Sequence, residues 1–243
     1  MSGTWKAADI VAVHDETETA RTIRMSFPEP IRFLPGQHVD IRLTAPDGYQ
    51  AVRSYSVASA SLPDTLEITV QELPDGEVSP YLVRMLAVGE KLEVRGPVGG
   101  WFVWRPEDTS PVQLIAGGSG VVPLMAMIRA RAATNNPAPF RLLYSVASPE
   151  AVYFRQELKS LEQSSDNLEV TYVYTRSAPD GQPVGRLEAR TLEANVIGRE
   201  ADPSIYICGA TGFVETVSRW LVDFGYSTDR IKTERYGGLG GAS

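Results

Sequence analysis

Residues 53–56 (RSYS) place a permanent cation, a phenol ring and two serine hydroxyls at four consecutive positions: Arg53, Ser54, Tyr55 and Ser56. If this segment is a strand, Arg53 and Tyr55 share one face, because side chains alternate along a strand. A guanidinium binds phosphate through paired hydrogen bonds, and a phenol ring can pack on a flat ligand. The combination fits a ligand with a phosphate and a planar ring. An exposed arginine beside a half-buried tyrosine is the simpler interpretation of the same residues.

Two later segments are rich in glycine: Gly117 to Pro123 (GGSGVVP) and Cys208 to Gly212 (CGATG). Each follows an apolar run of strand length and precedes a segment with helical spacing. Glycine lets the backbone approach a diphosphate closely, and a helix start adds unpaired N–H groups and a positive dipole end. However, the first segment reads G-x-G-x-x-P, and the second apolar run ends in YSVAS without a ribose-binding acidic residue. A plain tight turn stays an alternative there, and a standard NAD-dehydrogenase is disfavoured.

The chain has 243 residues with one cysteine, Cys208, and two histidines, His14 and His38. One cysteine excludes an intrachain disulfide, a thiolate-ligated iron–sulfur cluster and a four-cysteine zinc site. The histidines lie in separate strand-like segments, so we predict no metal site. A lone cysteine in a strand is commonly a small buried hydrophobic residue. Any electrons that this chain moves must therefore be carried by an organic cofactor.

Short alternating segments fill the chain up to about residue 104. Apolar residues recur at every second position in 23–27, 39–43, 66–70 and 92–94, and turns begin at Pro35, Pro46 and Pro74. This period predicts antiparallel strands with one solvent-facing side, closed into a small β-barrel. Ser79-Pro80 predicts a helix start, with the serine as N-cap and the proline at the first helical position.

The pattern changes after the polar segment Trp104 to Pro111. Five apolar runs follow, separated by segments with helical spacing, and Gly225 marks a helix end. This alternation predicts a doubly wound α/β domain with a five-stranded parallel sheet covered on both faces. Such sheets bind ligands at the carboxyl ends of their strands, where the winding reverses between the first and fourth strands. Those are the two strands that run into the glycine segments. We predict domains at residues 1–106 and 107–243.

The net charge is −7 and Lys and Arg form no dense run, which argues against a nucleic-acid surface. The content of 43% hydrophobic and 22% charged residues is typical of globular proteins. No apolar run of about 20 residues predicts a membrane span. The first residues, MSGTWKAADI, lack the basic and then apolar regions of a signal peptide. We therefore expect a cytoplasmic protein without nucleic-acid or membrane partners.

Five strings occur in order: RSYS at 53, GEVSPYL at 76, GPVGGWF at 96, GGSGVVP at 117 and CGATGF at 208, with PGQ at 35. Together they resemble the ferredoxin–NADP(H) reductase superfamily over nearly the whole chain. The resemblance implies an FAD-binding barrel followed by an NAD(P)H-binding domain. It implies an oxidoreductase that passes a hydride from NAD(P)H to FAD and electrons to a separate acceptor, such as a ferredoxin or flavodoxin. Alternatives are a reductase of free flavin, dioxygen or another small acceptor, and a non-catalytic docking subunit.

The resemblance also implies roles for residues of the first domain. Arg53 would contact the flavin diphosphate, Tyr55 would pack on the isoalloxazine ring and Ser56 would lie near flavin N5. The G-x-x-S element adds a phosphate contact at the point where the helix start is predicted. The remaining members of the predicted flavin-binding set are Ser54, Gly76, Val78 and Ser79.

For the second domain the resemblance implies contacts with the nicotinamide dinucleotide. Gly118, Ser119 and Gly120 would face its diphosphate, while Cys208 and Gly209 would meet the nicotinamide, with Cys208 in a positioning role. The predicted catalytic set is Ser56, Cys208 and Tyr236, in which Tyr236 of ERYGG resembles the aromatic residue that shields the flavin.

The end of the third strand bears on the choice of nucleotide. Thr175-Arg176 stands where NADPH-using relatives tend to carry Ser-Arg for the 2′-phosphate, and Arg186 follows closely. We therefore predict NADPH. NADH stays an alternative, because an arginine at a strand end is often merely solvated.

Overall fold

The computed structural model describes residues 4–60 and 64–236. The chain divides into two compact units. Unit 1 runs up to Arg105 and also includes Met125–Ala130. Unit 2 comprises Pro106–Leu124 and the residues from Arg131 onward.

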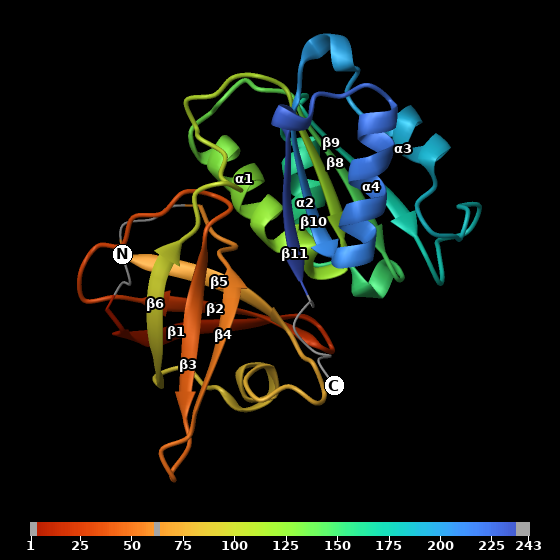
Figure 1. Cartoon of the computed structure of the whole chain (residues 1–243). Coiled ribbons are helices and arrows are strands. Elements are labelled where there is room, and N and C mark those ends of the chain that lie inside the picture. Colours follow the sequence, from red (N-terminus) through yellow and green to blue (C-terminus); the bar gives the residue numbers. More distant parts are fainter. Residues whose placement is uncertain (1–3, 61–63, 237–243) are drawn as a thin grey trace. The chain divides into compact units, whose positions relative to one another are not determined.

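Unit 1 contains a six-stranded antiparallel sheet with the order β4-β3-β6-β1-β2-β5 (Figure 1). Val57, directly after β4, forms an antiparallel bridge with Ile68 of β5, so the two edge strands meet. Closure of this kind removes exposed sheet edges. The predicted antiparallel β-barrel is confirmed. Its strands are β1 (Lys6–Thr17), β2 (Ala20–Ser26), β3 (His38–Thr44), β4 (Gln50–Ser56), β5 (Thr65–Gln71) and β6 (Lys91–Val98).

The three predicted turns of this unit each close with a backbone hydrogen bond. The N–H of Gln37 donates to Leu34 O at 3.1 Å, and the N–H groups of Gly48 and Gly76 donate to the third residue before them at 2.9 and 2.8 Å. Gly36, after Pro35, has φ +94°, which is the signature of a type II turn. Proline and glycine in these positions therefore set the strand connections.

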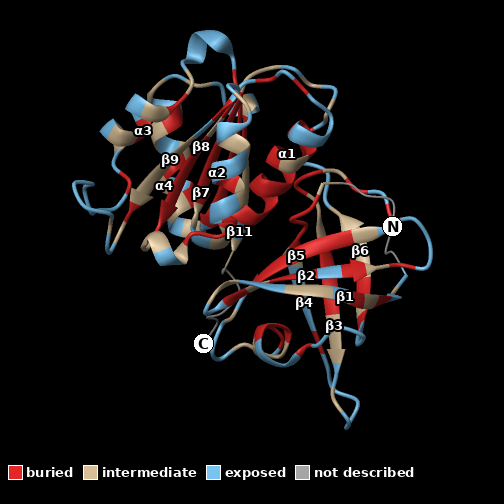
Figure 2. Cartoon of the chain, turned by 180° about the vertical axis from the view of Figure 1, so that it is seen from behind, coloured by how far each residue is buried: buried red, intermediate tan, exposed pale blue. Residues whose placement is uncertain are grey.

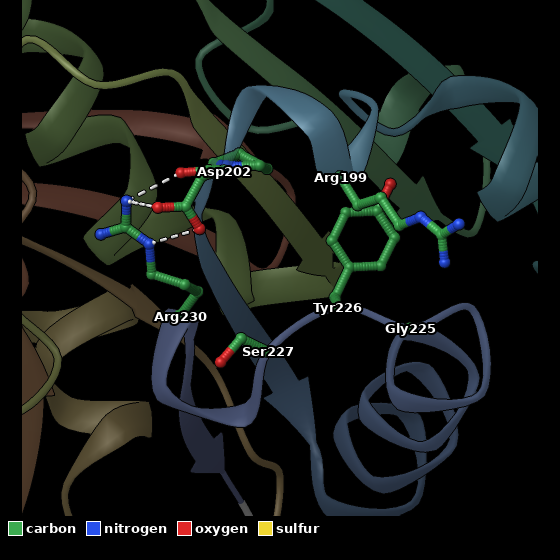
Figure 3. Close-up of a pocket in the computed structure, with 7 residues that line it drawn as sticks. Arg199, Asp202, Gly225, Tyr226, Ser227 and Arg230 are labelled. Atoms are coloured by element: carbon green, nitrogen blue, oxygen red, sulfur yellow. Dashed lines mark hydrogen bonds and ion pairs between the residues drawn. The ribbon is translucent and has the colours of Figure 1, made fainter.

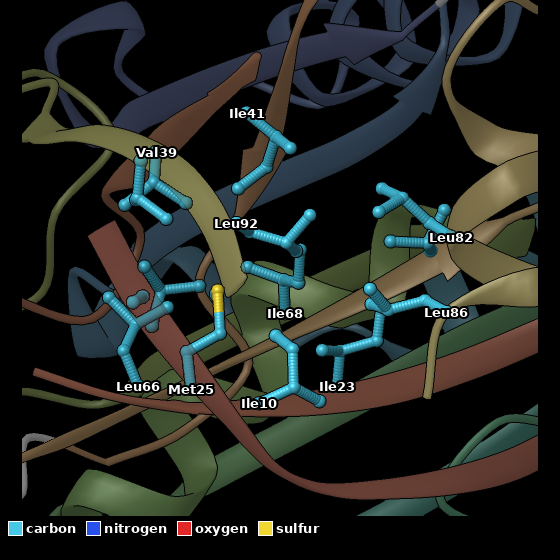
Figure 4. Packing of buried hydrophobic residues seen from close by; sticks show 14 of the residues in the cluster. Ile10, Ile23, Met25, Val39, Ile41, Leu66, Ile68, Leu82, Leu86 and Leu92 are labelled. Atoms are coloured by element: carbon cyan, nitrogen blue, oxygen red, sulfur yellow. The ribbon is translucent and has the colours of Figure 1, made fainter. Parts of the chain in front are cut away.

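The barrel core gathers inward side chains of the strands together with Leu82 and Leu86 from the segment between β5 and β6, as Figure 4 shows. Met25, Ile41 and Ile68 are fully buried within it. The expected solvent-facing side is wrong for β5, in which residues 66–70 are all buried. Its polar side chains have partners instead: the hydroxyls of Thr69 and Thr22 lie 2.7 Å apart.

Between β5 and β6 lies η1 (Tyr81–Met85), a single π-helical turn. The prediction that Ser79 caps it is wrong, since no side chain makes a capping hydrogen bond there. The Ser79 hydroxyl instead accepts the N–H of Leu73 at 3.0 Å, which ties the helix start to the preceding turn. A serine at this position closes a loop and leaves the helix uncapped.

Unit 2 contains a five-stranded parallel sheet with the order β11-β10-β7-β8-β9. The first and fourth strands of the unit, β7 and β10, are neighbours, so the winding reverses between them. The predicted doubly wound domain is confirmed. Its strands are β7 (Val112–Gly117), β8 (Phe140–Val146), β9 (Leu168–Tyr174), β10 (Ser204–Ala210) and β11 (Ile231–Tyr236).

Helices cover both faces of this sheet. Figure 1 shows α1 and α2 on the opposite side of the sheet from α3 and α4. The helices are α1 (Val121–Ala133), α2 (Arg155–Gln163), α3 (Ala189–Asn195) and α4 (Thr211–Asp223), with short 3-10 turns η2 (Gly118–Gly120), η3 (Pro149–Ala151), η4 (Arg199–Ala201) and η5 (Thr228–Arg230). Figure 2 shows α1 buried along most of its length, whereas α4 buries one stripe. None of the helices in the described ranges is long and apolar enough to cross a membrane.

The C-terminal end of α4 is closed as its sequence predicts. Gly225 has φ +87°, and its N–H donates to Val222 O at 2.9 Å. The N–H of Tyr226 donates to Leu221 O at 3.0 Å. These paired bonds form a Schellman motif, in which glycine adopts the left-handed conformation without steric cost.

Candidate functional site

Arg53 and Tyr55 share one face of β4, as the alternation predicts. They pair in register with Ile41 and Val39, whose side chains belong to the barrel core. Tyr55 packs against this core, and burial raises the pKa of its phenol to about 12. The Arg53 side chain is 50% exposed. A neutral ring and an accessible guanidinium therefore lie side by side.

The Arg53 guanidinium is held by two partners. Nη1 donates to Val52 O at 2.8 Å, and Nη2 forms an ion pair with the Glu77 carboxylate. The Tyr49 hydroxyl donates to the other oxygen of the same carboxylate at 2.6 Å. Glu77 was not among the residues predicted from sequence. Its position inside GEVS, next to two predicted phosphate contacts, was the available signal.

The two residues after Glu77 turn their side chains inward, and the backbone amides of this loop stay available. Val78 is fully buried in the barrel core, and the Ser79 hydroxyl is bonded to Leu73. Among the described residues, no hydrogen bond involves the backbone N–H groups of Glu77, Val78 and Ser79. Three successive free amides beside an exposed arginine are a donor set that fits a phosphate group.

The two serines of RSYS do not join Arg53 and Tyr55. The Ser54 hydroxyl donates to Asp40 Oδ1 at 2.6 Å, on the other face of β4. Asp40 also receives paired hydrogen bonds from Arg95, which hold the Ser54 side chain in a polar network. Ser56 is buried, with 5% of its surface exposed. The predicted contact of Ser56 with the flavin stays a prediction.

In unit 2 the two glycine segments touch directly. A Cβ atom added to Gly120 would lie 2.1 Å from the carbonyl oxygen of Cys208 and 2.8 Å from the nitrogen of Gly209. Gly120 therefore allows a backbone approach that no other residue permits. Gly118, with φ +55°, faces open space. Gly117 and Gly209 instead pack against the Phe213 ring, so Gly118 is the glycine at these strand ends whose backbone a diphosphate can approach.

Helix starts lie at both strand ends. Gly118, Ser119 and Gly120 form η2, which leads directly into α1, and α4 begins at Thr211. Neither η2 nor α4 has a side-chain cap or an acidic residue in its first turn. Their terminal N–H groups and positive dipole ends favour an anion.

Cys208 is completely buried and lies beside β11. It pairs in register with Glu234, and its side chain is hydrogen-bonded to Tyr236. Burial raises the pKa of the thiol well above its usual value, with the nearby charge of Glu234 as a second cause. The thiol is therefore neutral at physiological pH. The structure brings the predicted residues Cys208, Gly209 and Tyr236 together and adds Glu234, whose signal was its position two residues before Tyr236.

Thr175 and Arg176 directly follow β9, at the carboxyl ends of the parallel strands, where the two glycine segments also lie. Their backbone N–H groups donate to Val146 O and Ala147 O, both at 2.9 Å, which fixes the chain beyond the strand. The Arg176 and Arg186 side chains are exposed. Neither forms an ion pair within the described ranges.

A separate pocket lies at the amino ends of the parallel strands, where β10 and β11 begin (Figure 3). Its volume is about 170 Å³. Arg230 of this pocket is already neutralised by Asp202, with Nε to Oδ1 at 3.0 Å and Nη2 to the Asp202 carbonyl at 2.9 Å. Arg199 donates to Phe224 O at 3.2 Å. The arginines therefore secure loops in this pocket, which contains none of the residues predicted to bind a ligand.

Comparison with known proteins identifies the family. Residues 8–103 match the oxidoreductase FAD-binding domain family, and residues 114–219 match the oxidoreductase NAD-binding domain family. The ferredoxin NADP+ reductase of Neisseria gonorrhoeae, solved with FAD and NADP, aligns with a TM-score of 0.81 at 25% identity over 95% of this chain and 98% of its own. The chain belongs to the ferredoxin–NADP(H) reductase superfamily. FAD and a nicotinamide dinucleotide are confirmed as its cofactors.

Other members of the superfamily resemble the chain over most of its length. The glycine betaine monooxygenase reductase subunit of Chromohalobacter salexigens is 33% identical over 93% of this chain. The reductase component of the naphthalene 1,2-dioxygenase/salicylate 5-hydroxylase systems of Ralstonia sp is 26% identical over 93%. The chain spans 63% and 67% of these two relatives. The FAD/NAD-binding domain of Vibrio cholerae nitric oxide dioxygenase aligns over 98% of this chain and its whole length, with a TM-score of 0.86 at 25% identity.

Proposed function

We propose that the chain is an NAD(P)H-oxidising flavoprotein reductase that delivers electrons to a separate acceptor protein. The observation that carries the proposal is the pair of anion-binding donor sets, one in each unit. Arg53 and the amides of residues 77–79 suit the flavin phosphates, and Gly118 to Gly120 beside Cys208 suit the dinucleotide. Residues 1–106 would form the FAD-binding domain and residues 107–243 the NAD(P)H-binding domain.

FAD, when bound, supplies the redox chemistry, because it accepts two electrons from NAD(P)H and releases them singly. The chain contributes binding and orientation. Arg53 neutralises the flavin phosphate, and the Tyr55 ring supports the isoalloxazine. The backbone N–H groups of Val78 and Ser79 complete the phosphate contacts, and Gly76 shapes the preceding turn through its bond to Leu73 O. The Ser54 side chain is engaged with Asp40. Ser56 is proposed near the flavin ring.

In unit 2, Cys208 and Gly209 would position the nicotinamide, with Glu234 and Tyr236 beside them. The buried thiol stays protonated, so its role is contact and placement. We propose NADPH as the preferred donor, because the exposed Arg176 guanidinium has no ion-pair partner in the part of the chain that the structure describes and can meet a 2′-phosphate. Arg186 is a second cation in the same loop. Arginine suits this task through its paired N–H donors.

The acceptor is proposed to be a ferredoxin, a flavodoxin or an oxygenase component. Relatives that span most of this chain are named as reductase parts of oxygenase systems, which supports a protein acceptor. Cys208 alone cannot hold an iron–sulfur cluster, so electrons leave this chain directly from its flavin. A cytoplasmic location remains our prediction.

The proposal is tested by purifying the protein and recording its visible spectrum, followed by NAD(P)H oxidation assays. We expect a yellow protein that releases FAD on denaturation and oxidises NADPH when ferredoxin, flavodoxin or an artificial one-electron acceptor is supplied. A colourless protein that neither binds added FAD nor oxidises either nucleotide would contradict the proposal. Faster turnover with free flavin or dioxygen than with every protein acceptor would instead favour a small-acceptor reductase.

A further inference from the structure

We propose that the aromatic ring of Tyr49 is the platform on which the adenine of FAD stacks. This assignment rests on the proposed function, in which Arg53 binds the flavin phosphate and Tyr55 supports the isoalloxazine. It extends that site to the adenine, for which the motif strings supplied no residue. The group recognised is a purine base that is joined to a diphosphate.

Tyr49 presents its ring to solvent in the hairpin between β3 and β4. The residue is 57% exposed, although most of its side chain is an apolar ring. Covering such a ring with a flat ligand removes apolar surface from water and adds a contact between two π-systems. The exposed ring is therefore suited to a planar base.

Hydrogen bonds fix Tyr49 at both ends. Its backbone N–H donates to Asp47 Oδ1 at 3.0 Å, and its carbonyl accepts the N–H of Ala45 at 2.8 Å. At the far end of the side chain, the hydroxyl donates to the Glu77 carboxylate at 2.6 Å. These bonds restrict rotation of the ring before a ligand binds. A ring that is already ordered loses little conformational entropy on stacking, which favours binding.

The Glu77 carboxylate places Tyr49 on the same side of the hairpin as Arg53. One of its oxygens accepts the Tyr49 hydroxyl, and the other pairs with the Arg53 guanidinium. Arg53 lies on the face of β4 that also carries Tyr55. On this face, Ala51 is the residue between Arg53 and Tyr49, and it is buried. The strand therefore sets only a small, buried side chain between the cation and the exposed ring.

The order of these side chains matches the order of the groups in FAD. Tyr55, Arg53 and Tyr49 follow one another toward the hairpin. FAD joins its isoalloxazine to a diphosphate and, through a ribose, the diphosphate to adenine. Because the Arg53 and Tyr49 side chains converge on one carboxylate, the ring lies beside the proposed phosphate contact. A base that is one ribose away from the phosphates can reach it.

This contact distinguishes the two flavin nucleotides by shape. FMN shares the isoalloxazine, the ribityl chain and one phosphate with FAD but has no adenine. Stacking on Tyr49 therefore stabilises bound FAD and leaves bound FMN unaffected. Removal of an aromatic ring that stacks on a base weakens binding about 5- to 150-fold.

The test is isothermal titration calorimetry of the full-length apoprotein with FAD and with FMN. We expect Tyr49→Ala to raise Kd(FAD) about 5- to 150-fold and to leave Kd(FMN) unchanged. Tyr49→Phe keeps the ring and removes the hydroxyl, so it should bind both nucleotides nearly as tightly as the wild type. The comparison of these two variants needs FAD alone, so it also decides the question if FMN binds too weakly to titrate.

Trp101 provides a matched control, because it is another exposed aromatic residue of the same unit. It is 63% exposed and has no role in the proposed adenine contact. Trp101→Ala should leave the ratio Kd(FMN)/Kd(FAD) unchanged, whereas Tyr49→Ala should lower it. Thermal melts of each apoprotein verify that the variants fold.

Three results overturn the assignment: an unchanged ratio in Tyr49→Ala, the same loss of FAD affinity in Tyr49→Phe, or an equal fall of the ratio in Trp101→Ala. Arg53→Ala separates these results from failure of the proposed function. If the wild-type apoprotein binds neither flavin, or Arg53→Ala binds both as tightly as the wild type, the flavin site is misplaced and both proposals fall. If Arg53→Ala weakens binding of FAD while Tyr49→Ala does not, only the adenine contact of Tyr49 is disproved.

Discussion

Arg176 is the side chain on which the choice between NADPH and NADH depends in our proposal. Its backbone is anchored by the bond to Ala147 O, while its guanidinium is exposed and has no ion-pair partner in the described ranges. Arg176→Ala should raise the KM for NADPH about 10- to 100-fold, the value of a charge-assisted hydrogen bond, and change the KM for NADH less than about twofold. Steady-state kinetics with both nucleotides measure this difference.

Arg219 is a suitable control, since it is an exposed arginine of α4 in the same unit. Arg219→Ala should leave the ratio of the two KM values unchanged. Equal increases of the KM values for NADPH and NADH in Arg176→Ala would contradict the proposed preference for NADPH. Arg176 would then be a solvated surface residue without a role in nucleotide selection.

Cys208 should act by position and not as a nucleophile. Its thiol is buried and its pKa is raised, so iodoacetamide should modify the folded protein far more slowly than the unfolded chain at pH 7.5. Cys208→Ala should lower the rate of flavin reduction by NAD(P)H about tenfold or more through misplaced nicotinamide, with FAD affinity unchanged. Stopped-flow absorbance and FAD titration measure the two effects. Rapid alkylation of the native protein would contradict this description.

At the scale of elements, Gly120 is the residue that lets η2 approach β10. Gly120→Ala would place a Cβ 2.1 Å from the Cys208 carbonyl oxygen, so strand and helix start must separate. We expect the free energy of unfolding to fall by about 3 kcal/mol, as for other overpacked sites, and NAD(P)H binding to weaken. FAD binding should persist, because Arg53 lies in the other unit. Denaturant unfolding and nucleotide titration provide the measurements.

Gly212 serves as the comparison for this substitution. A Cβ there meets nothing within 4 Å, and the residue lies in the first turn of α4. Gly212→Ala should therefore leave stability unchanged or raise it by up to about 1 kcal/mol through helix propensity. If Gly120→Ala and Gly212→Ala had the same free energy of unfolding, the close contact at Gly120 would not contribute to stability.

The order of elements could be predicted from sequence, but the direction of several side chains could not. Alternation and turn residues predicted the barrel, and the apolar runs predicted the parallel sheet with its reversal between β7 and β10. Spacing alone could not show that Ser79 bonds back to Leu73, or that Asp40 holds Ser54. Both depend on residues far from the motif, or on loop geometry that no periodicity encodes. The short helix α3 also carried no clear signal.

The same reason explains why two acidic residues near the proposed ligands were missed. Glu77 and Glu234 contact their partners across strands or turns, and their significance follows from register: Glu234 lies opposite Cys208. Sequence spacing places such residues near a motif without revealing which side chain they face. Motif strings therefore located the loops proposed to bind ligand, while the acidic residues beside them emerged only from the three-dimensional pairing.

At the scale of the whole molecule, both units contain half-buried phenols whose pKa values are raised. Burial brings the pKa of Tyr55 in unit 1 and of Tyr172 in unit 2 to about 12, and Cys208 is shifted in the same direction. A group whose pKa is higher in the folded state stabilises the fold below its unfolded pKa. That contribution is lost as the pH rises toward the folded value. The chain should therefore be more sensitive to alkali than to modest changes around neutrality.

Denaturant unfolding from pH 7.5 to pH 11 should reveal this sequence of losses. The free energy of unfolding should begin to fall near pH 9, where an unfolded thiol ionises, and fall more steeply above about pH 10, where unfolded tyrosines ionise. Cys208→Ala should make the decline above pH 9 shallower, and Tyr172→Phe should make the decline above about pH 10 shallower. The FAD concentration is held constant, because bound ligand adds stability. A free energy of unfolding that rises above pH 9, or a decline that neither variant alters, would show that ionisation of these buried groups does not limit the stability of the fold.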